Sequence, residues 1–178
     1  MFFKELETKR LLIKNIACED REFILAQFSN DEVNRYLFDA EPLVDLKGAD
    51  EIIAFYTRPE PRCQHRWILV RKEDGAKIGT CGFHCWDMNH GTCDMGYDLS
   101  PAFWNMGYMG EAAQGIIRFA RENMRVERID AHISANNRNS AKLAEKLGFV
   151  DSGRQYSLAF RGGEYPHRVY SLYLTREA

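Results

Sequence analysis

Residues 104–110, Trp-Asn-Met-Gly-Tyr-Met-Gly, have the composition of a loop that could hold an anion. The residues before it, 92–99, alternate as in a strand, and residues 109–123 have the apolar spacing of a helix. A strand that passes through a loop into a helix presents unpaired backbone N–H groups, with the positive end of the helix dipole behind them. Gly107 and Gly110 lack a Cβ and let the backbone approach a phosphate closely. Taken alone, the pattern predicts either a phosphate cradle or a simple tight turn.

A second polar segment, residues 136–149, follows the next predicted strand, 128–133. Asn139 or Ser140 can cap a helix that continues through Leu147. Gly148 then suits the left-handed position that ends a helix. Together, the two segments are far more specific than either one alone.

Cysteine and histidine residues at 81–93 raise the question of a metal site. Because side chains alternate along a strand, Cys81 and Cys85 would share one face while His84 points to the other, and the ligands would not converge. The five cysteines form no CxxC pair and are odd in number, which argues against a disulfide framework. We therefore expect reduced thiols and no metal.

Length and composition favour one globular domain over residues 1–178. The chain has 178 residues, of which 45% are hydrophobic, enough for a core without metals or disulfides. The net charge is −2 and no Lys/Arg stripe is present, so we expect no nucleic-acid partner. No stretch approaches the roughly 20 apolar residues of a membrane span, and the N-terminus lacks a signal-peptide pattern. We expect no membrane partner and a cytoplasmic protein.

The remaining elements must position these segments. Strands are predicted at 8–15, 67–70, 77–85, 152–160 and 168–175, and helices at 20–29 and 50–56. Turns at 73–75 and 161–164 join neighbouring strands. This order predicts an α+β domain with a mixed, mostly antiparallel sheet and interleaved helices.

With both segments in view, the chain resembles the GNAT superfamily of N-acetyltransferases, and within it the RimJ/RimL-like ribosomal-protein alanine acetyltransferases with their spermidine- and antibiotic-modifying relatives. The segments that carry the resemblance are 6–13, 78–80, 94–97, 104–110, 136–149 and 169–172. It implies the GNAT fold: a central sheet of about seven strands with one splayed pair, and about four flanking helices. It also implies acetyl-CoA as the acetyl donor.

The resemblance assigns the cofactor loop residue by residue. The family's pattern, Gln or Arg, two residues, Gly, one residue, Gly or Ala, falls on Trp104, Gly107 and Met109, and only Gly107 matches strictly. Because main-chain N–H groups bind the pyrophosphate in the family, loop shape matters more than side-chain identity. The implied loop contacts are Trp104, Asn105, Met106, Gly107, Tyr108, Met109, Gly110 and Glu111.

Further cofactor contacts are implied on either side of that loop. In the family the preceding strand splays from its neighbour and pairs with pantetheine, which implies main-chain roles for Asp98 and Leu99. Asn137 and Ser140 match the family's Asn-x-x-Ser pattern on the cofactor side. Helix capping is an alternative role for both, and the two roles are compatible.

The implied reaction is direct attack of an amine on the thioester carbonyl, with a backbone N–H holding the oxyanion. Deprotonating a lysine-like amine at pH 7 costs about 4 kcal/mol, whereas an α-amine costs about 1.4 kcal/mol, so a weak base suffices for an α-amine. Asp94 is the first candidate base, His84 the second and Glu111 the third.

The proton donor is less well defined by the resemblance. The tyrosine that many relatives place four residues before the helix-ending glycine is Ala144 here, which leaves Ser140 as the candidate donor to the leaving thiolate. His167 stands where relatives often have Asp, so any role of that Asp is in doubt. Aromatic residues expected either to line the acceptor cleft or to belong to the core are Tyr36, Phe38, Trp86 and Tyr108.

Three functions follow as hypotheses. The first is acetylation of a protein or peptide α-amine. The second is acetylation of a small amine such as a polyamine or aminoglycoside, which an acidic acceptor pocket would favour. The third is a non-catalytic acyl-CoA sensor, suggested by Met109 and Ala144. A monomer and a homodimer are both compatible with the sequence.

Overall fold

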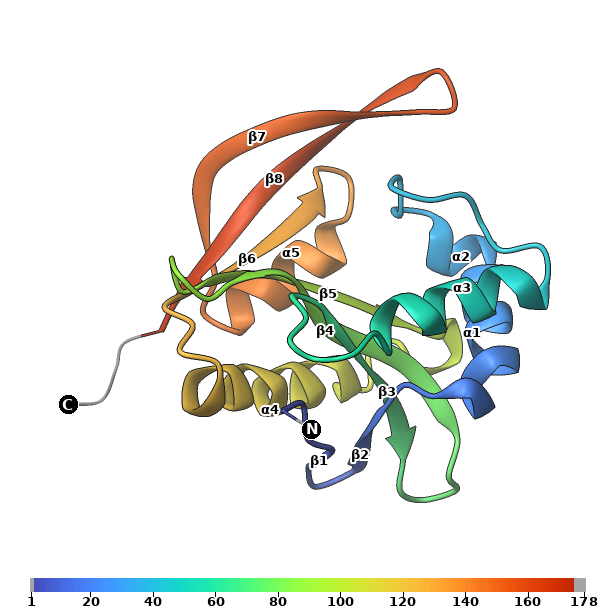
Figure 1. Cartoon of the computed structure of the whole chain (residues 1–178). Coiled ribbons are helices and arrows are strands. Elements are labelled where there is room, and N and C mark those ends of the chain that lie inside the picture. Colours follow the sequence, from blue (N-terminus) through green and yellow to red (C-terminus); the bar gives the residue numbers. More distant parts are fainter. Residues whose placement is uncertain (1, 175–178) are drawn as a thin grey trace.

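The computed structural model describes residues 2–174, which form one open sheet with helices on both faces (Figure 1). The strands are β1 (Leu6–Glu7), β2 (Leu11–Asn15), β3 (His65–Arg71), β4 (Lys77–Asp87), β5 (Thr92–Leu99), β6 (Arg128–Ser134), β7 (Val150–Phe160) and β8 (Gly163–Tyr173). The α-helices are α1 (Arg21–Phe28), α2 (Asp31–Asn34), α3 (Leu46–Tyr56), α4 (Tyr108–Asn123) and α5 (Arg138–Lys146).

The strand order is β1-β2-β3-β4-β5-β6-β8-β7, and every pair is antiparallel except β5 with β6. That parallel ladder covers only Thr92↔Arg128, Cys93↔Ile129 and Asp94↔Asp130. Beyond Asp94 the two strands diverge, so the sheet is open at its centre. The expected splayed pair is confirmed, and the α+β sheet has eight strands where about seven were expected.

Each face of the sheet has its own core. On one face, α4 packs Ile116 and Ala113 against strand residues that include Phe83 and Ile129. On the other, α1 and α3 pack Ile24 and Ile53 around Ile68 of β3. Because side chains alternate along a strand, the even-numbered residues of β5 and β6 lie on the α3 side and are free of the α4 core.

The last two strands form a long hairpin that arches away from the sheet (Figure 1). The segment between α2 and α3 meets its tip. Phe38 stacks on Tyr165 with ring centroids 3.8 Å apart, and Arg161 pairs with Glu41. The tip of the β7–β8 hairpin and the segment between α2 and α3, called the roof segment below, thus lie together and form what we call the roof.

The differences from the predicted elements have local causes. The helix expected at 50–56 begins at Leu46, because the Asp45 side chain accepts the Gly48 N–H and caps it. The cap of α5 is Asn137, not Asn139 or Ser140, since its Oδ1 accepts the Ser140 N–H at 3.1 Å. Gly148 has φ +92°, as expected for the end of that helix.

Candidate functional site

The loop before α4 has the geometry of an anion cradle. Gly107 is the N-cap of α4 with φ +78°, a conformation that L side chains rarely adopt, and Asn105 has φ +60°. The first-turn N–H groups of α4, from Tyr108 onward, have no partner within the helix. The Met106 carbonyl accepts a hydrogen bond from Arg10 Nη1 at 2.9 Å, which fixes the loop to the β1–β2 turn. The cradle is therefore preformed.

The Glu111 carboxylate holds this loop in place through hydrogen bonds. Its carboxylate accepts from Thr8 Oγ1 at 2.6 Å, from Arg10 N at 2.7 Å and from Arg10 Nε at 2.6 Å. Burial opposes its ionisation, but the hydrogen bonds from Thr8 and Arg10 outweigh it and hold the pKa of Glu111 below its usual value. Arg10 also lies 4.3 Å over the Tyr108 ring. Glu111 does not line the cleft, so the geometry gives it a positioning role and not that of a base.

The edge of β5 beyond Asp94 faces the opening between the strands. The Ser100 N–H donates to the Ile78 carbonyl at 2.8 Å, so main-chain groups of the even-numbered residues face β4. Those of Tyr97 and Leu99 face β6, from which β5 has diverged. The Leu99 carbonyl accepts from Trp104 Nε1 at 2.7 Å, which leaves its N–H facing the opening. The Leu99 N–H thus faces the opening, whereas the Asp98 main chain faces β4.

The Asp98 side chain lies in a buried polar network. It accepts from Arg66 Nη1 at 3.0 Å, from Gln27 Nε2 at 2.7 Å and from the Thr80 hydroxyl. Ser100 Oγ donates to the other end of Gln27 at 2.6 Å. Asp98 therefore anchors β5 to β3, β4 and α1, and a buried carboxylate of this kind requires these partners.

A cleft of about 830 Å³ runs along the open side of β5 under the roof. Its lining includes the expected residues His84, Asp94, Asn137, Ser140, Tyr36 and Phe38. The other two aromatic candidates belong to the core instead: Trp86 stacks on Phe2 with centroids 5.2 Å apart, and Tyr108 is buried under Arg10. The cleft thus brings together residues from both halves of the sequence.

His84 is held as a neutral imidazole. Arg66 Nη2 donates to its Nε2 at 3.2 Å, and the Tyr56 hydroxyl lies 3.3 Å from its Nδ1. Burial, reinforced by the Arg66 charge, lowers the pKa of His84 to about 4. An imidazole of that basicity is a poor proton acceptor at pH 7. The structure therefore favours a hydrogen-bonding role for His84.

Asp94 faces a histidine that the sequence analysis missed. His132 of β6 places Nε2 3.5 Å from Asp94 Oδ1, and its Nδ1 lies 3.0 Å from Tyr156 Oη. The hydrogen bond with Asp94 raises the pKa of His132, although partial burial opposes this. Asp130 and His132 alternate onto one face of a strand that the sequence did predict, but only the parallel register with β5 reveals that this face meets Asp94.

Asn137 and Ser140 lie where α5 meets the cleft. Ser140 Oγ is 2.8 Å from Tyr97 Oη, which links α5 to the open part of β5. Burial raises the pKa of Tyr97 to about 12, so the phenol stays protonated. Asn137 is the helix cap, and its place on the cleft lining is compatible with a second contact.

His167 and the cysteines complete the list of expected residues. His167 is buried, donates from Nδ1 to the Tyr165 carbonyl at 2.8 Å and stacks on Tyr156. Cys81 and Cys93 are buried in the core, and Cys85 is exposed with φ +50°. Within residues 2–174, no group of three or more His, Cys, Asp or Glu residues is placed to hold a metal ion. Nor is any helix of that part long and apolar enough to cross a membrane.

Comparison with known proteins identifies the chemistry that this geometry serves. The model of the acetyltransferase (GNAT) domain matches residues 10–150. The uncharacterized N-acetyltransferase YoaA of Bacillus subtilis is 33% identical over 178 residues, covering 98% of this chain and 99% of that protein.

Two solved structures share the fold at low identity. The ribosomal-protein α-N-acetyltransferase RimL, in complex with coenzyme A, superposes with a TM-score of 0.87 at 10% identity, covering 98% of this chain and 100% of RimL. A spermidine N-acetyltransferase from Vibrio cholerae, solved with CoA and spermine, superposes with a TM-score of 0.82 at 16% identity, covering 93% of this chain and 96% of that one. The match of the domain model and of the full-length relative shows that this chain belongs to the GNAT family of acetyltransferases, enzymes that use acetyl-CoA as acetyl donor.

Proposed function

We propose that this N-acetyltransferase acts on the α-amine of a protein or peptide, which enters the cleft between the roof and the open part of β5. The observation that carries the proposal is that the unpaired β5 edge and the side chains of Asp94 and His132 face one cleft. Donor and acceptor can therefore meet there. The cleft holds no strongly basic, unpaired side chain, and such modest equipment suits an amine that loses its proton near pH 8.

The cofactor sites that we propose are main-chain groups. The Tyr97 and Leu99 edge would pair with the pantetheine arm, and the Gly107 loop with the α4 N-terminus would hold the pyrophosphate. The fit rests on Gly107, whose positive φ and missing Cβ leave the N–H groups accessible. Bound there, acetyl-CoA supplies an acetyl thioester. Ser140, whose hydroxyl contacts Tyr97 Oη, would give a proton to the departing thiolate.

The walls of the cleft also support a peptide acceptor. Phe38, Tyr36 and Leu158 offer apolar surface on the roof side, where the first side chains of a peptide would lie. Four of the five carboxylates of the lining are already paired: Asp98 with Arg66, Glu41 with Arg161, Glu51 with Lys47 and Asp94 with His132. The part of the cleft proposed to hold the acceptor therefore offers aromatic surface and little unpaired negative charge.

One residue favours a polyamine as second candidate. Asp39 is exposed on the roof segment, lines the cleft and has no ion pair within residues 2–174. A carboxylate at that position would attract a second ammonium group.

The test follows thiol release from acetyl-CoA with matched acceptors. Peptides with a free α-amine are compared with the same peptides blocked at the N-terminus but carrying a lysine, and with spermidine. We expect turnover with the free peptides and little with the blocked ones. Turnover with spermidine alone would establish the second candidate, and acetyl-CoA binding without thiol release from any acceptor would establish the sensor.

A further inference from the structure

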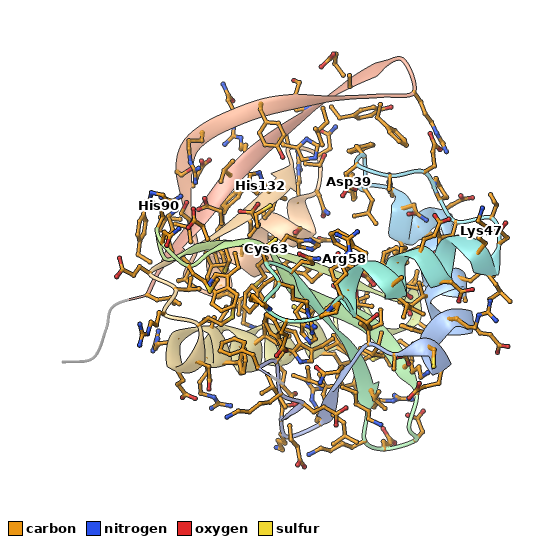
Figure 2. The ribbon with its side chains drawn as sticks, viewed as in Figure 1. Asp39, Lys47, Arg58, Cys63, His90 and His132 are labelled. Carbon is orange, nitrogen blue, oxygen red and sulfur yellow. The ribbon has the colours of Figure 1, made fainter. Side chains whose placement is uncertain are left out.

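Three polar side chains from three strands form a chain at the point where β5 and β6 diverge. Asp94 of β5 contacts His132 of β6, and His132 contacts Tyr156 of β7, over 3.5 and 3.0 Å. All three line the cleft. Figure 2 shows His132 beneath the β7–β8 hairpin and Asp39 on the segment between α2 and α3.

The partners of the imidazole determine where its proton lies. An ionised carboxylate only accepts hydrogen bonds, so the Nε2 beside Asp94 carries the proton. Nδ1 of the neutral ring is then left to accept the hydroxyl proton of Tyr156. The order hydroxyl, imidazole, carboxylate is the arrangement by which enzymes prepare a hydroxyl for proton transfer.

We propose that Tyr156, His132 and Asp94 form a proton relay that deprotonates the acceptor ammonium, with Tyr156 Oη at the acceptor end. This inference rests on the proposed function. The ammonium gives one proton to Tyr156 Oη as the phenol proton passes to His132 Nδ1, and Asp94 stabilises the imidazolium. The freed amine forms the N–C bond while the C–S bond breaks and its electron pair leaves on sulfur. Ser140 gives its proton to that sulfur and is reprotonated by the second amine proton, giving amide and thiol, and His132 returns its proton to water through Tyr156.

The groups around His132 act in opposite directions on its pKa, and on balance they raise it. Asp94 and Asp130 favour the imidazolium, while Arg154 of β7 disfavours it. Asp130 is itself held by Arg154 Nη2 at 2.7 Å and by Ser171 Oγ at 2.6 Å, so Asp94 is the carboxylate that faces the ring directly.

Tyr156 is held independently of its hydroxyl. Its ring stacks on buried His167, with centroids 5.4 Å apart and planes 19° from parallel. Tyr156→Phe therefore keeps the packing and removes only the relay group.

The experiment compares Tyr156→Phe, His132→Gln and Asp94→Asn with the wild type by pH profiles of kcat/KM for a peptide acceptor. His90→Gln is the matched control, because His90 forms an exposed pair with Asp87 over 2.7 Å outside the cleft. At pH 7 we expect His132→Gln and Tyr156→Phe to lose about 100-fold or more, with the Kd for acetyl-CoA unchanged. The loss should shrink to a few-fold at about pH 10, where the α-amine is already free.

A readout independent of turnover follows the His132 ring protons by NMR titration. In Asp94→Asn the titration midpoint of His132 should fall, while that of His90 stays in place. A loss that is constant from pH 7 to 10, full activity in His132→Gln, or a midpoint unaffected by Asp94→Asn would each overturn the relay. Failure of the proposed function is distinct: the wild type itself would bind acetyl-CoA and acetylate no peptide.

Discussion

Replacing Gly107 tests the proposed phosphate cradle most directly. A side chain at φ +78° costs about 1–2 kcal/mol in backbone strain, whatever the space around it. Glutamate adds a negative charge as well. At about 6 Å from a phosphate and an effective dielectric constant of about 20, the repulsion is about 2.8 kcal/mol, or roughly a hundredfold in Kd.

The positive charge of Arg10, which lies beside Gly107, would reduce this repulsion. A Cβ on Gly107 would lie 3.5 Å from Arg10 Nη2, the one nearby heavy atom within 4 Å. Arg10 already donates to Met106 and Glu111, so it can offset only part of the new charge. We therefore expect Gly107→Glu to bind acetyl-CoA 10- to 100-fold more weakly than Gly107→Gln, which has the same size and strain and no charge.

The assay is calorimetric titration of acetyl-CoA into the wild type and the Ala, Gln and Glu variants at low and high salt. The Kd of Gly107→Ala reports the effect of backbone strain alone. The difference in Kd between Gly107→Glu and Gly107→Gln isolates the effect of the charge. The gap between Glu and Gln should narrow in about 1 M salt, where screening is strong. Equal affinities of the Glu and Gln variants at low salt, or wild-type affinity in Gly107→Glu, would refute the phosphate assignment.

Four further substitutions probe the residues that support the site. Glu111→Gln should lower the free energy of unfolding at pH 7 by about 1–3 kcal/mol. The pKa of Glu111 is lowered on folding, so this stabilisation exists above the usual value of 4.5 and is lost as the pH falls through the folded value; urea unfolding at pH 7 and pH 3 checks it. Asp98→Asn leaves Arg66 buried without its charge partner and should lower the free energy of unfolding by about 3–5 kcal/mol in the same assay. Arg161→Gln, in the exposed roof pair, should leave the free energy of unfolding nearly unchanged. Phe38→Ala should raise the KM for a peptide acceptor and leave the Kd for acetyl-CoA unchanged. A weaker affinity for acetyl-CoA in this variant would contradict the proposal that the roof side of the cleft holds the acceptor only.

The sequence predicted the elements whose signals are local. Residues 92–99 form β5 with the expected bounds, and the helix expected at 109–123 begins one residue earlier, at Tyr108. Alternation and helical spacing need no knowledge of the rest of the chain. The expected helix at 50–56 was too short because Gly48, a weak helix former, lies in the first turn after its cap, Asp45.

What the sequence could not supply was pairing between distant strands. Asp94 could be proposed as a base from its position alone, but His132 could not be added, since only the β5–β6 register brings the two together. The same holds for Glu111, whose partners Thr8 and Arg10 are about a hundred residues away. A carboxylate at the start of a helix does not reveal, from the sequence alone, that its hydrogen-bond partners lie in a distant turn. Side-chain partners across a sheet depend on topology, which periodicity does not encode.

The alternation of β5 explains how one strand can serve both substrates. Odd-numbered residues turn their main chain toward the gap left by β6, where the donor would pair, and even-numbered residues turn side chains toward the acceptor cleft. Gly96 lies between Asp94 and Asp98 on that face. A Cβ there would lie 3.2 Å from His84 Nε2 and 3.8 Å from Arg66 Nη2, so the glycine makes room for the pair that keeps His84 neutral. Because a one-residue slip would exchange the two sets, the register of β5 against β4 fixes which groups face the gap left by β6 and which face the cleft. The buried Arg66–Asp98 pair and its partners Thr80 and Gln27 hold that register, so part of the site's geometry depends on the contacts that join β5 to β3, β4 and α1.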